Sequence, residues 1–253
     1  MARTRHGERS DAAVVALLQR PAAVEQQDPS ADPRLIAVVQ SALLDWHDRQ
    51  RTDLPWRRTR DPYAILVAEF MLQQTQRARV APRFTEFLAL FPTVEALAAA
   101  PTAAVLRAWS GLGYNSRALR LQRVARAVVE AGDGIPGDLD SLRALPGIGE
   151  YTARAILCFG FGQDTWLVDT NVTRVLQRVF TGEAYPRPRA RLDSRLAELA
   201  LPHGEAYAWN SALMDLGATI CLARGPRCST CPLQGQCRAA AGFTEATDVP
   251  ALR

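Results

Sequence analysis

Residues 145–153 read Leu-Pro-Gly-Ile-Gly-Glu-Tyr-Thr-Ala and lie between two stretches whose apolar residues have helical spacing. Gly147 and Gly149 permit a tight turn and allow another molecule to approach the backbone closely. Backbone N–H groups at the start of the second helix can then face a phosphate, because a helix N-terminus favours an anion. The segment predicts a hairpin of two helices. By itself it leaves open both a phosphate-binding turn and a plain connection.

Helical spacing continues on both sides of this hairpin and begins at Arg34. We expect further helices at about 63–74, 77–90, 93–99, 102–109, 115–131, 138–144, 149–161, 170–180, 189–199 and 205–219. A short helix is also expected around Ala12 to Gln19. Proline or glycine separates most of these segments, and none alternates with the period of a strand. The sequence therefore predicts an all-α protein.

The composition excludes one kind of catalysis. The chain has 253 residues, of which 48% are hydrophobic, and all thirty basic residues are arginine. Without lysine, no side-chain amine can form a Schiff base. The net charge of +4 indicates a polyanionic partner only weakly. No apolar stretch could span a bilayer and no secretory signal begins the chain, so we expect a cytoplasmic protein without a membrane partner.

Four cysteines form the pattern C-x6-C-x2-C-x5-C, and they are Cys221, Cys228, Cys231 and Cys237. Thiols this close in a cytoplasmic chain are more typical of metal ligands than of disulfides. The unequal spacing fits a cubane iron–sulfur cluster, while zinc remains an alternative. Arg224 and Arg227, in a region without acids, suit phosphate contact, although they could also only offset thiolate charge. Cys158 is interpreted as a buried apolar residue.

Two carboxylates stand in apolar surroundings. Glu69 interrupts an apolar run that should form a buried helix, and burial would raise its pKa enough for it to act as a general acid near neutral pH. The alternative is a structural pair with an arginine. Asp169 precedes Thr170 and has the position of a helix N-cap, which is commonly only structural. A cap also holds a carboxylate rigidly, as an electrostatic or nucleophilic role requires.

The hairpin, the segment 168–172 and the four cysteines have the order and spacing of the helix-hairpin-helix DNA glycosylases, from about Arg34 to Arg238. The chain resembles the endonuclease III branch, and most closely the MutY-type adenine DNA glycosylases. The segments that carry this closer resemblance are Leu54-Pro55-Trp56-Arg57, Glu69-Phe70-Met71-Leu72-Gln73-Gln74-Thr75-Gln76 and Trp109-Ser110-Gly111-Leu112-Gly113-Tyr114.

The resemblance implies a fold of two helical lobes, a [4Fe-4S] cluster on the four cysteines and double-stranded DNA bound across the cleft. The domains expected from it are a flexible arm (1–33), a cluster domain (34–55 and 167–238), a helical-barrel domain containing the hairpin (56–166) and a tail (239–253). We expect a monomer. The DNA would contain a mismatch or an oxidised guanine.

The resemblance also implies roles in DNA binding. Gln74 would wedge into the duplex and Tyr114 would intercalate, with Thr75 and Leu112 near the opposing purine. Gly147 and Gly149 would bind phosphate. Trp56 and Arg57 would wall the pocket of the extruded adenine.

For the chemistry, the resemblance implies that Glu69 protonates adenine N7 and that Asp169 stabilises or traps the oxocarbenium ion. Asn171 and Tyr151 would position these groups and the water. Relatives with lyase activity have a catalytic lysine where this chain has Tyr151, so we expect a monofunctional glycosylase that removes adenine opposite guanine or 8-oxoguanine.

Three departures from the family pattern bear on specificity. Only sixteen residues follow Cys237, so we expect no C-terminal domain for recognising 8-oxoguanine. Asn115 stands where a second tyrosine is common, and Ser211 where a longer Gln or Glu is common. A monofunctional thymine or uracil glycosylase acting on mismatches with guanine is one alternative. A non-catalytic binder of damaged DNA is another, but both carboxylates are present.

Overall fold

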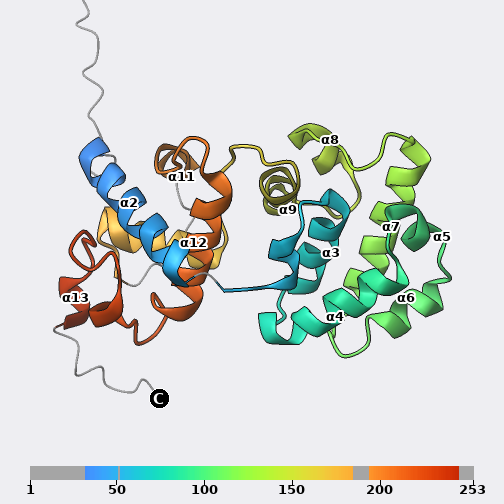
Figure 1. The fold of residues 1–253 in the computed structure, drawn as a ribbon, viewed down its shortest axis with the longest axis horizontal. Coiled ribbons are helices and arrows are strands. Elements are labelled where there is room, and N and C mark those ends of the chain that lie inside the picture. The colour runs from blue at the N-terminus through green and yellow to red at the C-terminus, as the bar shows by residue number, and fades with distance from the viewer. Residues whose placement is uncertain (1–31, 51, 185–193, 245–253) are drawn as a thin grey trace, which may run out of the picture.

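A computed structural model of the chain describes residues 32–50, 52–184 and 194–244. Within these ranges every regular element is helical, so the prediction of an all-α protein is confirmed (Figure 1). The short helix expected around Ala12 to Gln19 lies outside the described residues, as do most of the expected arm and most of the expected tail.

The elements follow the predicted helices closely. In order they are α2 (Pro33–Gln50), η2 (Pro55–Arg58), α3 (Pro62–Leu72), α4 (Arg77–Leu90), α5 (Val94–Ala99), α6 (Thr102–Ala108), α7 (Ser116–Ala131), α8 (Leu139–Ala144), α9 (Glu150–Ala155), η3 (Ile156–Gly160), α10 (Thr170–Leu176), η4 (Gln177–Thr181), α11 (Ser194–Leu199), α12 (Ala206–Thr219), η5 (Cys228–Thr230) and α13 (Ala241–Thr244).

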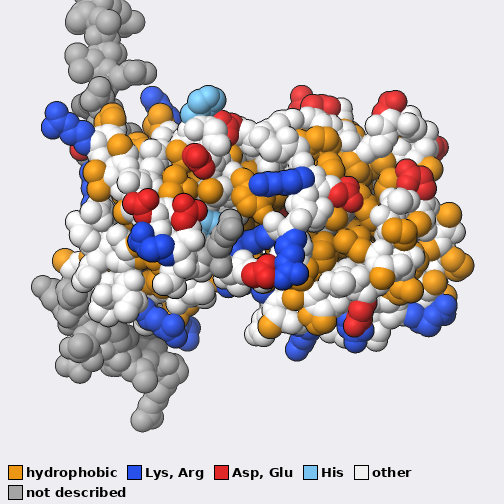
Figure 2. Space-filling view, viewed as in Figure 1, with side chains coloured by type: hydrophobic (Ala, Val, Ile, Leu, Met, Phe, Trp, Pro, Cys, Tyr) orange, Lys and Arg blue, Asp and Glu red, His pale blue; other side chains and the backbone are white. Residues whose placement is uncertain are grey.

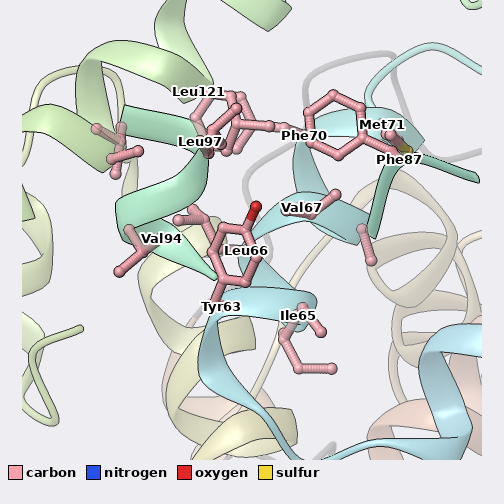
Figure 3. Packing of buried hydrophobic residues seen from close by; sticks show 14 of the residues in the cluster. Tyr63, Ile65, Leu66, Val67, Phe70, Met71, Phe87, Val94, Leu97 and Leu121 are labelled. Atoms are coloured by element: carbon pink, nitrogen blue, oxygen red, sulfur yellow. The ribbon is translucent and has the colours of Figure 1, made fainter. Parts of the chain in front are cut away.

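Helix α3 is the centre of one lobe. Its N-cap is Asp61, whose carboxylate accepts a hydrogen bond from the backbone N–H of Tyr63, and Pro62 occupies the first turn, where no N–H is required. The helix is apolar on all sides, and its residues from Tyr63 to Met71 are all buried, as expected for a helix surrounded by others. Side chains from α4, α5 and α7 pack around it (Figure 3).

A second lobe has its own core, formed mainly by α2, α10 and α12. Leu43, Val175 and Leu213 are among its fully buried residues. The two lobes lie side by side, with α9 near their junction (Figure 1). One core draws its residues from Leu54 to Leu157, and the other from Ile36 to Leu43 and from Val172 to Leu233, so the chain leaves one lobe and returns to it.

Five elements were not predicted: the 3-10 turns η2 and η5, the π-helical turns η3 and η4, and the short helix α13. The expected helices 149–161 and 170–180 each end in a π-helical turn, η3 and η4. Periodicity cannot reveal such a turn, because one wider turn at the end of a helix changes the apolar spacing over only a few residues. The short helix α13 lies in the expected tail. Among the described residues, no helix is both long enough and apolar enough to cross a membrane.

Candidate active site between the two lobes

A cavity of about 530 Å³ lies at the junction of the lobes. Its lining includes eight residues that the sequence singled out, from both lobes: Trp56, Arg57, Glu69, Thr75, Tyr151, Asp169, Asn171 and Ser211. Ligand pockets commonly have volumes of roughly 300–1,000 Å³, so a single flipped nucleotide is a suitable occupant by size. Several basic side chains surround this junction on the face shown in Figure 2.

Glu69 comes from the buried helix α3 and is only 8% exposed. Burial, followed by the nearby charge of Asp169, raises the pKa of this carboxyl to about 8, while a hydrogen bond with Tyr151 partly opposes the rise. The carboxyl therefore holds its proton near neutral pH. Among the described residues no arginine or histidine forms an ion pair with Glu69, so the structural pair with an arginine, considered as an alternative, is absent from this part of the chain.

Tyr151 stands in the first turn of α9, directly after the glycine hairpin. Burial and the charges of Glu69 and Asp169 raise the pKa of its phenol well above the usual value. The phenol therefore remains protonated and acts as a hydrogen-bond donor. A phenol cannot serve as an amine nucleophile.

Asp169 is the N-cap of α10, as the sequence predicted. One carboxylate oxygen accepts a hydrogen bond from the backbone N–H of Val172 at 2.7 Å, and the other lies 3.4 Å from Asn171 Nδ2. The Asn171 side-chain oxygen accepts from Arg174 at 2.9 Å. The cap and the amide thus hold the carboxylate in place at the cavity wall, close to the helix N-terminus that favours its negative charge.

Gly217 supports this arrangement from the opposite helix and was not singled out from the sequence. It is buried in α12, and a Cβ atom added there would lie 2.7 Å from Asn171 Cβ. Asn171 can occupy its position only because residue 217 has no side chain. A glycine inside an otherwise apolar helical segment was the available signal.

We expect Gly217→Ala to displace Asn171 and to slow base release at least tenfold. The substitution should also cost about 1–3 kcal/mol of stability through overpacking. Single-turnover kinetics and thermal unfolding measure the two effects. Gly242→Ala is the matched control, since its added Cβ would meet only Ala184 at 3.8 Å. Equal rates in wild type and Gly217→Ala would show that this close contact does not position Asn171.

Asp215 is a second residue that sequence reasoning missed. It is 2% exposed and accepts hydrogen bonds from Arg57 at 2.7 and 3.1 Å and from Arg77 at 2.6 Å. His47 Nε2 lies 3.7 Å from the same carboxylate. Burial alone would raise the pKa of Asp215, but the two arginines outweigh it and lower the pKa. A lone acid in an apolar helix was the signal, and that signal was followed only for Glu69.

This ion cluster joins the lobes, because Asp215 is on α12 while Arg57 and Arg77 are on η2 and α4. Both arginines also line the cavity. The two hydrogen bonds to Asp215 fix the orientation of the Arg57 side chain. The resemblance predicts this side chain in the wall of the pocket.

Asp215→Asn should destabilise the protein by about 3 kcal/mol near neutral pH, because it leaves two partly buried guanidinium groups without a counter-charge. The difference in unfolding free energy between wild type and Asp215→Asn should shrink as pH falls. The pKa of Asp215 is lower in the folded than in the unfolded protein, so its stabilising contribution is full above the pKa of an unfolded aspartate and is lost as pH falls through the folded value. Denaturant unfolding at several pH values measures it. Asp53→Asn, which removes an exposed partner of Arg58, is the control and should have little effect. A similarly small effect at Asp215 would contradict this account.

Gln74 and Tyr114, which the resemblance predicts to enter DNA, do not line the cavity. Gln74 and Tyr114 are exposed, Tyr114 at 64%. Thr75 lines the cavity and also hydrogen-bonds the loop of Leu112 through its hydroxyl. The side chain of Leu112 is part of the core at 2% exposure, so its contact with DNA stays a prediction.

The hairpin lies between α8 and α9. Gly147 has φ 91°, a conformation that residues with side chains rarely adopt. A Cβ atom added there would lie 3.5 Å from Arg120 Cδ. Gly149 is the N-cap of α9 with ordinary φ, and a Cβ added there would meet nothing within 4 Å. The turn therefore requires glycine at position 147, whereas at 149 glycine leaves the backbone open to an approaching molecule.

The four cysteines of the C-terminal loop line one small, apolar hollow together with Arg178 and Leu233. Arg178 Nη1 lies 3.3 Å from Cys221 Sγ and stabilises negative charge on that sulfur. Four thiols around one hollow match the donor set of an iron–sulfur cluster. Within the described residues, however, no three potential ligands have the arrangement that holds a metal ion. Arg224 and Arg227 are exposed on this loop, and Cys158 is fully buried as predicted.

The chain belongs to the HhH-GPD superfamily of base excision DNA repair proteins. The sequence model of this family matches residues 67–198. The predicted superfamily is thereby confirmed, and with it the enzyme class of DNA glycosylase and DNA as the partner in general terms.

Within the superfamily, the chain is similar to MutY-type enzymes. It is 48% identical over 208 residues to an adenine DNA glycosylase of Mycolicibacterium smegmatis, covering 81% of this chain and 71% of that relative. A thermostable thymine-DNA glycosylase has a similar structure, with TM-score 0.77, 32% identity and coverage of 83% of this chain and 98% of the other. A trapped endonuclease III–DNA intermediate, at TM-score 0.71, 23% identity and coverage of 85% and 99%, shares the fold.

Proposed function

We propose that this chain is a monofunctional DNA glycosylase that hydrolyses the N-glycosidic bond of adenine mispaired with guanine or 8-oxoguanine. The observation that carries the proposal is the pair of carboxyl groups in one cavity, Glu69 with its pKa raised to about 8 and Asp169 held at a helix N-terminus. Similarity to adenine DNA glycosylases supports adenine as the base.

The reaction follows from the different positions of these two groups, Glu69 on the buried helix α3 and Asp169 at the N-terminus of α10. Adenine leaves poorly until a ring nitrogen is protonated, and Glu69 holds a proton for N7 near neutral pH. As the bond to the sugar breaks, positive charge develops on the sugar, and Asp169 stabilises it or traps it covalently. Tyr151 holds the Glu69 carboxyl by a hydrogen bond, and Asn171 holds Asp169.

Access to the cavity requires the base to leave the DNA stack, which costs a few kcal/mol and least at a mismatch. The exposed side chains of Gln74 and Tyr114 are suited to fill the space that the base leaves. Trp56 is 8% exposed and, with Arg57, forms a wall of the cavity for the extruded adenine. Gly147 and Gly149 bind a backbone phosphate at the start of α9.

The same proposal assigns a [4Fe-4S] cluster to Cys221, Cys228, Cys231 and Cys237. The shared apolar hollow and the hydrogen bond from Arg178 to Cys221 support this ligand set. When bound, the cluster would fix the loop that presents Arg224 and Arg227 to phosphates. Purified protein with broad visible absorbance and bound iron is expected, and colourless protein with stoichiometric zinc would refute the cluster.

Single-turnover assays test the activity, using duplexes that contain A opposite 8-oxoguanine, A opposite G, T opposite G and U opposite G. Adenine release is expected from the first two, with strand cleavage only after alkali. The absence of lysine supports an intact strand, since no side-chain amine can open the abasic sugar. Strand cleavage without alkali would contradict the monofunctional assignment.

A thymine or uracil glycosylase is the second candidate, and similarity to the thermostable thymine-DNA glycosylase favours it. Ser211 bears on the choice, because it is 2% exposed, lines the cavity and is shorter than the Gln or Glu common in MutY-type enzymes. Release of thymine or uracil without adenine would establish this second candidate.

A further inference from the structure

Two loops carry the only non-glycine residues with positive φ among those the structure describes. They are Gln74, with φ 55°, and Tyr114, with φ 48°. A residue with a side chain in such a conformation costs on the order of 1 kcal/mol or more and persists only where its surroundings enforce it. Both side chains are exposed, so their own packing does not enforce it.

Arg117, near the start of α7, contacts both loops from inside. It is 3% exposed, and no carboxylate of the described residues forms an ion pair with it. Its Nη1 donates to the carbonyl oxygens of Phe70 and Met71, both at 2.9 Å, and of Gln73. These are carbonyls at the end of α3, which lack partners within the helix and favour a cation.

The other terminal nitrogen of Arg117 joins this helix end to the second loop. Nη2 donates to Thr75 Oγ1 at 2.9 Å, to the Leu112 carbonyl at 3.0 Å and to the Gly113 carbonyl at 3.1 Å. One guanidinium therefore binds the residues on both sides of Gln74 and the two residues before Tyr114. Its carbon also lies 5.5 Å from the centre of the Tyr114 ring.

We propose that Arg117 is a positioning residue that locks the loops of Gln74 and Tyr114 into one rigid unit before DNA binds. The proposal rests on the proposed function in so far as these two side chains enter DNA. A preformed unit removes the ordering cost that two separate flexible loops would incur at the duplex. Arg117 then acts on base extrusion and not on the chemistry in the cavity.

The planar guanidinium is required for this role. Four N–H groups on its two terminal nitrogens serve six acceptors, which lie at the end of α3 and in the two loops. A lysine ammonium has three donors at one point and cannot reach both sets together. Arg117→Lys therefore keeps the charge and separates the loops.

The first test uses free protein, so that it does not depend on any activity. Amide hydrogen exchange of peptides containing Gln74 and Tyr114 should be at least tenfold faster in Arg117→Lys than in wild type. Leu121→Ala is the matched control, since Leu121 is on the same helix, fully buried and has an apolar side chain that cannot hydrogen-bond either loop. It should lower thermal stability without this local effect. Unchanged exchange at either loop in Arg117→Lys would overturn the proposal.

The second test measures extrusion with duplexes that carry 2-aminopurine next to the mispaired base. Arg117→Lys should need at least tenfold more duplex for half-maximal fluorescence and half-maximal base release. Its rate at saturation, and the fall of that rate above about pH 8, should match wild type, because Glu69 is untouched. An equally large loss in the rate of base release at saturating duplex would overturn the positioning role. Wild-type affinity for the duplex in a variant with faster loop exchange would overturn it as well. If wild-type protein released no base at all, the proposed function would fail, while the exchange result would still stand.

Discussion

Glu69→Gln should reduce the single-turnover rate of adenine release by about 10³-fold, within the range of roughly 10²–10⁴ that general acid catalysis supplies. Glutamine has nearly the shape of a protonated glutamic acid and can keep the contact with Tyr151. It has no proton to give to the leaving base. Affinity for a mismatched duplex should therefore remain near that of wild type.

Base release and equilibrium binding, measured on the same duplex, check this expectation. Glu86→Gln is the control, because Glu86 is exposed and its ion pair is with Arg83, whose side chain is itself partly exposed. It should leave both quantities unchanged. Near-normal turnover in Glu69→Gln would remove Glu69 from the mechanism.

The raised pKa of Glu69 also predicts a change in stability with pH. The folded protein holds this proton up to about pH 8, whereas an unfolded glutamate releases it near its ordinary value of 4.5. The contribution of this carboxyl to the free energy of unfolding is therefore fully present below pH 4.5. It is lost as the pH rises from 4.5 to about 8. Glu69→Gln should accordingly unfold at a higher temperature than wild type at pH 8.5, with a smaller difference at pH 5. A difference independent of pH would contradict the raised pKa.

Asp169→Asn should have an effect of similar size, about 10²–10³-fold or more on base release, because it removes the charge that faces the developing cation. Asparagine caps a helix about as well as aspartate. The hydrogen bond from Val172 can therefore persist, and the fold and mismatch affinity should be retained.

Asp138→Asn supplies a control with the same local chemistry. Asp138 is the N-cap of α8 and accepts a hydrogen bond from the backbone N–H of Ser141, as Asp169 does from Val172, but it does not line the cavity. Its substitution should leave base release unchanged. Comparable losses in the two variants would mean that capping, and not the charge on Asp169, explains the effect.

The helices and the two carboxylates could be predicted from the sequence because both leave local signals. The apolar run around Glu69 predicts burial whatever the partners are, and burial alone accounts for the largest part of the raised pKa. The capping role of Asp169 depends on the residues that immediately follow it. Resemblance to a family then placed both in one site, which periodicity could not do.

Contacts between distant segments could not be predicted. Asp215 and Arg57 are 158 positions apart, and Arg117 and Gln73 are 44 apart. Gly217 matters only because α12 brings it against Asn171. The local sequence around each of these residues is ordinary. Their roles arise from the way the helices pack, and the sequence pattern predicts the helices but not their packing.

The most direct test of the central claim is the rate of adenine release by wild-type protein, measured in single turnover from pH 6 to pH 9.5 on a duplex with A opposite 8-oxoguanine. If a protonated Glu69 with a pKa of about 8 expels adenine, the rate should be nearly constant up to about pH 7.5. Above pH 8 it should fall by about tenfold per pH unit, as the population of protonated acid falls. A rate that rises through this range, or no release of adenine at any pH, would contradict the account.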